Sequence, residues 1–128
     1  MRILLDTQAF LWLSIDSPLL SKKAKKLFLD EENDFYLSVS SIWEMAIKVS
    51  IGKLTLHQPI EKFILNQLQE NCINQLNIEF RHVTKVSKLA FHHRDPFDRL
   101  IISQALEEEM PIMSSDSAFD LYSVKRLW

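Results

Sequence analysis

The chain has 128 residues, of which 47% are hydrophobic and 25% charged, and its formal net charge is −2. This length suits one compact domain with a sizeable core, and the charge lacks the basic surplus typical of nucleic-acid-binding proteins. The single glycine, Gly52, excludes glycine-rich phosphate loops. The single cysteine, Cys72, excludes an intrachain disulfide and fits a reducing compartment. No apolar run approaches the ~20 residues of a membrane span and the N-terminus is no signal peptide, so we expect a cytoplasmic protein without membrane contact.

The first half of the chain predicts two strands, each followed by helices. An apolar run at 2–5 indicates a buried parallel strand that stops at Asp6. Ser21 suits the N-cap of a lysine-rich helix, and Gly52 suits the C-terminal stop of a later one. The predicted elements of this half are strands at 2–5 and 34–39 and helices at 8–14, 22–32 and 41–52.

The second half predicts further alternation of helices and strands. An amphipathic helix begins at Pro59, and Asp95 followed by Pro96 begins a long helix that runs to about Glu109. We expect strands within 76–83 and at 111–115 and 124–128, a short helix from the Thr84 cap to Ala90, and a helical turn from Asp116. Alternating strands and helices favour an α/β fold with a mainly parallel sheet, whose functional sites form beyond the carboxyl ends of the strands.

Four acidic residues, the acidic quartet, fall at a predicted strand end or in the first turn of the following helix. They are Asp6, Glu44, Asp98 and Asp116. Because the carboxyl ends of parallel strands share one edge of a sheet, we expect these side chains to converge. Convergent carboxylates repel and raise one another's pKa values, and a divalent cation removes that conflict. Acidic oxygen-rich sites suit Mg²⁺ or Mn²⁺, which can activate water for phosphoryl chemistry.

Three members of the quartet also have a purely structural interpretation. Asp6 and Asp116 suit N-caps of the segments that follow them, and Glu44 completes a capping box with Ser41. Each of these interpretations stays open when its residue is taken alone. The joint placement of the quartet favours a shared site.

Asp98 is harder to explain as a helix cap. Ile101, Ile102 and Ala105 follow it at three, four and seven residues, which places Asp98 on the core-facing stripe of its helix. Desolvating a carboxylate without a partner costs several kcal/mol. The sequence therefore predicts a partner for Asp98.

Four segments resemble PIN-domain ribonucleases, specifically the VapC-type toxins of bacterial toxin–antitoxin modules. They are "LLDTQAFLW", "SVSSIWEMAIKVSIGKLTL", "HHRDPFDRLIISQA" and "SSDSAFDLYSVKRLW". They occur in the right order over nearly the whole chain, and "DPFDR" is among the most specific pieces. The stretch 57–90 is much less diagnostic.

The resemblance implies a single α/β PIN domain over 1–128, with about five mainly parallel strands flanked by helices. It implies Mg²⁺- or Mn²⁺-dependent cleavage of RNA to 5′-phosphate and 3′-hydroxyl ends, and by position it assigns catalysis and metal binding to the acidic quartet. It also implies a cognate antitoxin and a homodimer. The helices at 8–14 and 59–70 are candidate contact surfaces for these partners.

Other residues near the quartet are candidates for supporting roles. The Thr7 and Ser115 hydroxyls could hold metal-bound water, and Asp95 is an N-cap or an outer contact to metal or water. Lys48 and Arg99 are candidate contacts to RNA phosphates. For Arg94 and Lys53, by contrast, a solvated charge is the favoured interpretation.

Three further features carry less weight. Gln8 stands where close relatives often have histidine, which could alter substrate contact. His92 and His93 are adjacent, do not face one metal ion on a helix, and have no third histidine at ligand spacing. The aromatic residues that could stack on bases, but are more often core or interface residues, are Phe10, Trp12 and Trp43.

Competing functions are separated by specific residues. A haloacid-dehalogenase-type phosphatase needs an acid two residues after the first aspartate, where this chain has Gln8. A receiver-type signalling domain needs an early acidic pair, and only Asp6 is present. A structure-specific DNA nuclease, and a catalytically silent module that binds RNA or antitoxin, both remain alternatives to the ribonuclease.

Overall fold

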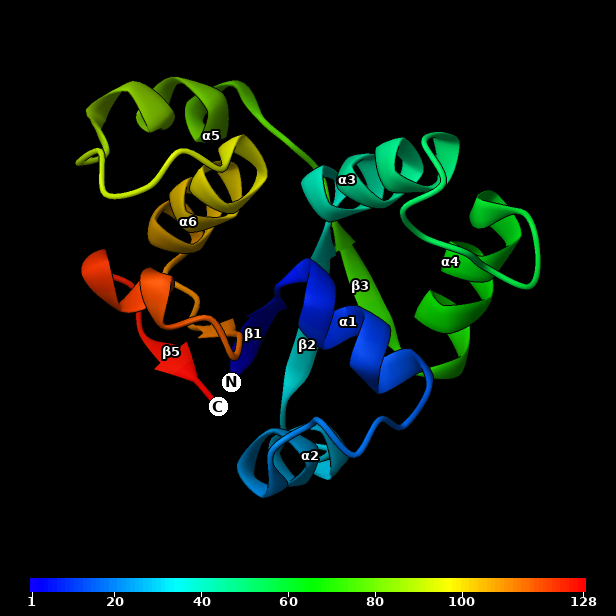
Figure 1. Ribbon diagram of the computed structural model, residues 1–128. Helices are drawn as coiled ribbons and strands as arrows, with labels where there is room; N and C mark the ends of the chain where they lie inside the picture. Colours follow the sequence, from blue (N-terminus) through cyan, green and yellow to red (C-terminus); the bar gives the residue numbers. More distant parts are fainter.

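The computed structural model describes residues 1–128 and contains a five-stranded parallel sheet with strand order β3-β2-β1-β4-β5 (Figure 1). The strands are β1 Arg2–Leu5, β2 Asp34–Ser38, β3 Ile73–Leu76, β4 Ile112–Met113 and β5 Arg126–Leu127. The helices are α1 Thr7–Ser14, α2 Lys22–Leu29, α3 Val39–Ser50, α4 Ile60–Glu70, α5 Phe80–Lys85 and α6 Pro96–Glu108, with 3₁₀ segments η1 Val86–Lys88 and η2 Ser117–Leu121. The predicted α/β fold with a parallel sheet is confirmed.

The central strand β1 divides the core into two apolar layers. Ile3 and Leu5 pack in one buried cluster with side chains of α1, α2 and α4, whereas Leu4 packs in another with α6 and η2. This alternation follows from the two-residue period of a strand, which sends successive side chains to opposite faces. Helices therefore cover both sides of β1, which explains why its last three residues are continuously apolar.

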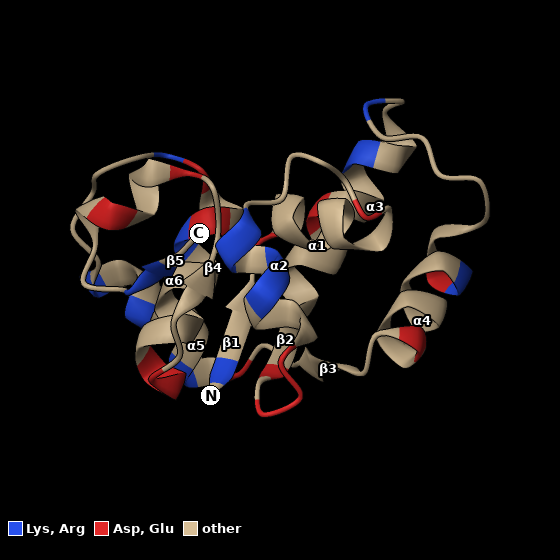
Figure 2. Cartoon of the chain, turned by 90° about the horizontal axis from the view of Figure 1, so that it is seen from below, with Lys and Arg blue, Asp and Glu red and all other residues tan.

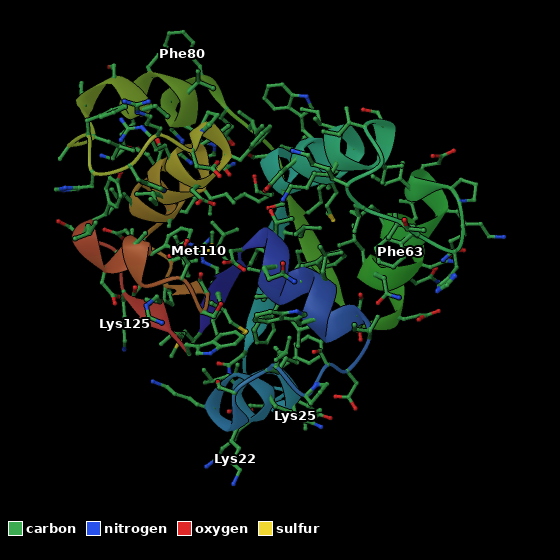
Figure 3. All side chains as sticks on the ribbon, in the orientation of Figure 1. Lys22, Lys25, Phe63, Phe80, Met110 and Lys125 are labelled. Carbon is green, nitrogen blue, oxygen red and sulfur yellow. The ribbon has the colours of Figure 1, made fainter.

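Aromatic side chains show how the outer helices are attached. Phe63 of α4 points toward α1 and meets the ring of Phe10 edge-on, with 6.2 Å between the ring centroids (Figure 3). Phe80 of α5 points away from the core and is 84% exposed. The predicted apolar face of α4 therefore packs on the domain, and Ile64 is its most buried residue.

The strand predicted within 76–83 and the cap predicted at Thr84 are wrong, although residues 84–88 are helical as expected. The third strand is β3, which ends at Leu76, and residues 80–85 form α5 rather than a strand. β3 lies at the sheet edge and buries only Ile73, so its polar sequence gives little strand signal. Helix α5 begins because the Glu79 backbone N–H donates to His82 Nδ1, 3.0 Å away, while the Glu79 side chain accepts from the N3 backbone. Thr84 therefore lies inside α5 and caps no later helix.

Several other elements differ from their predicted bounds by a few residues, α2 and α3 among them. α2 ends at Leu29, because Asp30 starts a turn in which its carboxylate accepts from Glu32 N. α3 begins at Val39, with Ser38 as the N-cap that accepts from Ser40 N.

The predicted caps at Ser21, Asp95 and Asp116 are confirmed. Each side chain accepts a hydrogen bond from a backbone N–H in the first turn that follows it. The carboxylates of Asp95 and Asp116 are thus held at the starts of α6 and η2. No helix in the structure is both long enough and apolar enough to span a membrane.

We predict that Leu4→Ala lowers the free energy of unfolding by about 2–5 kcal/mol, because Leu4 is fully buried in the central strand. Urea unfolding measures this loss. The matched control is Leu65→Ala, since Leu65 is 64% exposed on α4, and its effect should stay within about 0.5 kcal/mol. Equal losses for the two variants would contradict the layered core.

Candidate metal centre

The acidic quartet lies around one pocket of ≈ 280 Å³ at the carboxyl end of the sheet. Only one of its lining residues is hydrophobic. The pocket is lined by Asp6, Thr7, Gln8, Leu11, Glu44, Lys48, Asp95, Asp98, Ser115 and Asp116. Four separate elements supply these side chains, so the pocket depends on the fold rather than on one continuous sequence.

Asp6 is both a helix cap and a pocket residue. Its Oδ1 accepts from Ala9 N at 2.6 Å, which starts α1, and the residue is only 6% exposed. Burial raises the pKa of Asp6 to about 6, against the lowering effects of the Ser114 hydroxyl and the Ala9 amide, while the charges of Asp116 and Glu44 raise it further. The capping interpretation is correct, and it leaves the carboxylate at the pocket.

Glu44 is held by neighbours other than the predicted capping partner. Its Oε1 accepts from Thr7 Oγ1 at 2.7 Å, and its Oε2 pairs with Lys48 Nζ at 2.9 Å. Ser41 lies within α3, and its buried hydroxyl has no hydrogen-bond partner. The predicted capping box of Ser41 and Glu44 is therefore wrong. The hydrogen bond from Thr7 instead holds the Glu44 carboxylate next to the start of α1.

Asp98 is half-buried in the first turn of α6. Burial raises its pKa to about 7, and the charges of Asp95, Glu44, Asp6 and Asp116 raise it further, in that order. Asp95 is the N-cap of α6, with Oδ1 accepting from Phe97 N at 2.9 Å and from Asp98 N at 3.1 Å. The two aspartates thus lie close enough for the charge of Asp95 to raise the pKa of Asp98.

The sequence predicts that Asp98 needs a partner, and in the structure a histidine lies beside it. His93 Nε2 lies 3.4 Å from Asp98 Oδ2. His93 comes from the loop before α6, only five residues from Asp98, but the conformation of that loop, which turns the ring toward Asp98, is not evident from the sequence.

Asp116 completes the pocket from the loop after β4. It is exposed, and its Oδ1 accepts from Ala118 N at 2.9 Å, which starts η2. The buried Ser114, which the sequence analysis missed, accepts from Asp116 N at 3.0 Å and also bonds Asp6. Ser115 is exposed and lines the pocket. The sequence favours Ser115 because it adjoins Asp116, whereas Ser114 is distinguished by its complete burial in the structure.

The two predicted RNA contacts differ sharply. Lys48 lines the pocket with its ammonium group on Glu44. Arg99 is 7% exposed, and its guanidinium donates to Ala90 O, Val86 O and Tyr122 Oη. The prediction that Arg99 contacts RNA is wrong, because its donors are used inside the fold.

Other basic residues lie beside the pocket rather than on one continuous basic face. Lys53 and Arg94 line an adjoining hollow with Glu44 and Lys48. Lysine and arginine residues are otherwise spread over several elements, α2 among them (Figure 2). Any phosphate contact by side chains at the pocket therefore depends on a few lysine and arginine residues close to the carboxylates.

The predicted aromatic residues occupy different environments. Phe10 is buried in the core, and Trp12 packs against Trp128. Trp43 is 57% exposed and meets Phe97 edge-on, 5.0 Å between ring centroids. Of the three, Trp43 is the one that stays substantially exposed.

The donor set of the pocket fits a hard divalent cation. Burial and the negative charges of Asp95 and of the other three quartet members raise the pKa of Asp98. Lys48 is the only lysine or arginine among the lining residues. Oxygen ligands in excess of positive charge are what Mg²⁺ and Mn²⁺ require. The residues that would hold the ion are Asp6, Glu44, Asp98 and Asp116.

A second acidic group contains histidine but does not fit a metal ion equally well. The ligating atoms of Glu79, His82 and Glu108 lie within 4.8 Å of one another. Both nitrogens of His82 are already bonded, to Glu79 N and Glu108 Oε1, and Arg81 pairs with both glutamates. This group is a satisfied ion-pair network that joins α5 to α6.

We predict that Asp98→Asn stabilises the metal-free protein at pH 8 by about 1–2 kcal/mol, a value discounted for partial exposure. The folded-state pKa of Asp98 is raised from 3.8 to about 7, so the folded chain retains a proton that the unfolded chain releases. Stability therefore falls as pH rises through this window, and Asn abolishes that loss. Urea unfolding in EDTA should show the advantage fading toward pH 4. If the wild type and Asp98→Asn have the same free energy of unfolding at pH 8, the repulsion among these carboxylates is contradicted.

Comparison with known proteins agrees with this fold. The PIN domain family matches residues 3–125, and no curated protein matches the chain. The structure is similar to VapBC2 from Rickettsia felis bound to a promoter DNA fragment, with a TM-score of 0.73, 13% identity and 100% of both chains covered. It is also similar to VapBC-1 from nontypeable Haemophilus influenzae, with a TM-score of 0.66, 17% identity and coverage of 98% of this chain and 96% of that one.

A third similar structure is FitAcB from Neisseria gonorrhoeae, with a TM-score of 0.63, 19% identity and coverage of 97% of this chain and 95% of that one. These identities are low, so the three structures speak for the fold alone. The family match does not depend on them. Because it spans 3–125, nearly the whole sequence, this chain belongs to the PIN domain family.

Proposed function

We propose that this protein is a metal-dependent endoribonuclease and the toxin of a toxin–antitoxin pair. The observation that carries the proposal is the convergence of four carboxylates, from four separate elements, on one polar pocket. Membership in the PIN family supports nuclease activity. Cleavage of RNA with Mg²⁺ or Mn²⁺ is the specific form that we propose.

Each pocket residue would have a separate role in phosphodiester hydrolysis. A bound Mg²⁺ or Mn²⁺ would supply Lewis acidity toward the phosphate and toward water. Thr7 holds Glu44 in place, and Lys48 offers an ammonium group to a phosphate oxygen. Asp98 or Asp116 would orient the attacking water and accept its proton. Water attacks the phosphorus and the P–O3′ bond breaks, so the phosphate stays on the 5′-oxygen and the leaving 3′-oxygen takes a proton, which gives 5′-phosphate and 3′-hydroxyl ends.

A structure-specific DNA nuclease is the second candidate function. Water attack does not use the RNA 2′-hydroxyl, so the same carboxylates could act on either polymer. Relative rates on RNA and on DNA of the same sequence would separate these two functions.

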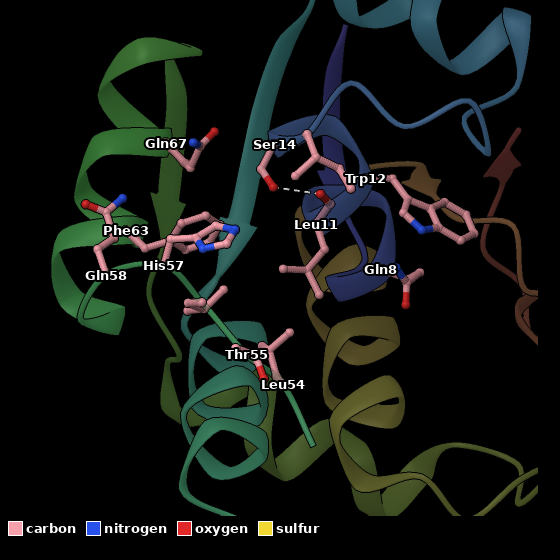
Figure 4. Close-up of a pocket in the computed structure, with 12 residues that line it drawn as sticks. Gln8, Leu11, Trp12, Ser14, Leu54, Thr55, His57, Gln58, Phe63 and Gln67 are labelled. Carbon is pink, nitrogen blue, oxygen red and sulfur yellow. Dashed lines mark hydrogen bonds between the residues drawn. The ribbon is translucent and has the colours of Figure 1, made fainter. Parts of the chain in front are cut away.

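An antitoxin partner is supported by an apolar cavity beside the pocket. The cavity has a volume of ≈ 520 Å³ and lies between α1, the 54–58 segment and α4, where Leu11, Leu54 and Phe63 line it (Figure 4). It shares Gln8 and Leu11 with the acidic pocket. One similar structure, VapBC-5 from Mycobacterium tuberculosis, is described as a member of the VapBC family of toxin-antitoxin systems. We propose that an apolar antitoxin segment fills this cavity, which would place a basic side chain of that segment near the carboxylates.

A homodimer is also part of the proposal. Trp43 and Ile47 of α3 and its C-cap residue Ile51 are large, exposed and spaced four residues apart. Residues at this spacing form one stripe on a helix. This stripe suits a second copy of the chain and leaves the α1–α4 cavity for the antitoxin.

We predict that Asp98→Asn lowers RNA cleavage by at least about 100-fold, and that EDTA abolishes cleavage by the wild type. The assay uses a mixed RNA pool with Mg²⁺, Mn²⁺ or EDTA. The matched control is Asp16→Asn, because Asp16 is exposed and pairs only with Lys25. Cleavage that survives both EDTA and Asp98→Asn would overturn the proposed function.

We predict that Lys48→Gln has opposite effects on the two ligands. Loss of the ammonium group weakens RNA binding and reduces the slope of log K against log salt by about 1, whereas Mn²⁺ binding tightens because Glu44 loses its ion-pair partner. Filter binding and calorimetry measure the two affinities. Lys62→Gln on the exposed face of α4 is the control, and an identical response of both lysine variants would rule out the phosphate contact.

A further inference from the structure

A line of polar contacts leads from the interior of the protein to the carboxylate of Asp98. Arg99 Nη1 lies 3.1 Å from Tyr122 Oη, and Tyr122 Oη lies 2.8 Å from His93 Nδ1. His93 Nε2 then lies 3.4 Å from Asp98 Oδ2. The groups come from α6, the end of η2 and the loop before α6, so three segments meet at one member of the quartet.

The chemistry of these groups assigns a direction to the hydrogen bonds. A guanidinium group only donates, so the Tyr122 oxygen accepts from Arg99. The Tyr122 hydroxyl proton is then available to His93 Nδ1, and we assign His93 Nδ1 as its acceptor. In a neutral imidazole whose Nδ1 accepts, the ring proton is on Nε2. The line therefore directs an N–H group of His93 toward Asp98.

The position of His93 Nε2 agrees with this direction. The atom is buried and has no hydrogen-bond partner of ordinary geometry. The carboxylate of Asp98 is 3.4 Å away, slightly longer than an ordinary hydrogen bond. Contacts at reaction centres are often long before ligands bind and shorten afterwards. A buried donor without a partner thus faces the one carboxylate that the sequence predicted would need one.

The far end of the line is firmly held. Arg99 also donates to Ala90 O at 2.9 Å and to Val86 O at 3.3 Å, and its guanidinium lies over the ring of Phe91. The ring of His93 packs against Tyr122, with 5.4 Å between centroids. His93 therefore has little freedom to turn away from Asp98.

We propose that His93 is a positioning residue that donates from Nε2 to Asp98 and holds this carboxylate in the orientation that binds the divalent cation. The inference rests on the proposed metal-dependent function. Outer partners of this kind orient ligating carboxylates and affect metal affinity. The buried Arg99 and Tyr122 acquire a role in setting the tautomer of His93. His93 itself is not a metal ligand, in agreement with the spacing of the histidines in the sequence.

The first test reads the tautomer directly. Long-range ¹H–¹⁵N NMR of histidine-labelled protein at pH 8 should show His93 with a proton on Nε2 and none on Nδ1. Tyr122→Phe should allow the other tautomer to appear, whereas Tyr36→Phe, on β2, should leave the spectrum of His93 unchanged. A wild-type His93 that carries its proton on Nδ1 would overturn the inference.

The second test measures Mn²⁺ affinity by calorimetry. His93→Phe keeps a ring against Tyr122 but loses the donor, and we expect its dissociation constant to rise about tenfold. His93→Gln, which retains an N–H donor, should recover part of the affinity. His92→Phe is the matched control, because His92 is exposed and also packs edge-on to Tyr122, with 4.9 Å between centroids, and it should bind as the wild type does.

The outcomes separate this inference from the proposed function. If the wild type and His93→Phe bind Mn²⁺ equally well, the positioning role is wrong while the metal centre stands. If the wild type binds no Mn²⁺, the metal centre itself is wrong and the inference falls with it. If urea titration shows that His93→Phe is unfolded even without urea, Tyr122→Phe replaces it in the calorimetry and should weaken Mn²⁺ binding as well.

Discussion

Repulsion among carboxylates at one edge of the sheet is the constraint on which the rest of the site depends. Burial and neighbouring charges raise the pKa values of Asp6 to about 6 and of Asp98 to about 7. Such a cluster works against folding unless positive charge enters it. Lys48 supplies one charge, to Glu44. The remaining excess of oxygen ligands is the physical basis for proposing a divalent cation. A bound cation would also give this acidic protein a means of attracting phosphate.

The fold tolerates this cluster because the acidic residues also begin its helices. Asp6, Asp95 and Asp116 each accept backbone N–H bonds at the start of a helical segment, where the helix dipole favours negative charge. Structural and chemical roles thus coincide in the same side chains. Interpreting such a residue as a cap does not argue against function, since the cap fixes the carboxylate at the carboxyl edge of the sheet where a ligand would bind.

The sequence predicts the α/β architecture, most helix starts and the convergence of the quartet, because strong signals govern them: continuous apolar strands, capping residues and the Asp-Pro start of α6. It fails at β3, whose edge position buries one residue, and at Arg99, because a buried arginine and an exposed one look alike in sequence. The burial of Ser114 and the contact of His93 with Asp98 depend on how the loops after β4 and before α6 fold against the rest of the chain. Local patterns do not encode that packing.

A crystal structure of the protein soaked with Mn²⁺ would decide whether the acidic quartet holds a metal ion, because the anomalous signal locates the ion. We expect one or two anomalous peaks enclosed by Asp6, Glu44, Asp98 and Asp116. A peak at Glu79, His82 and Glu108 instead, or none at the quartet at millimolar Mn²⁺, would contradict it.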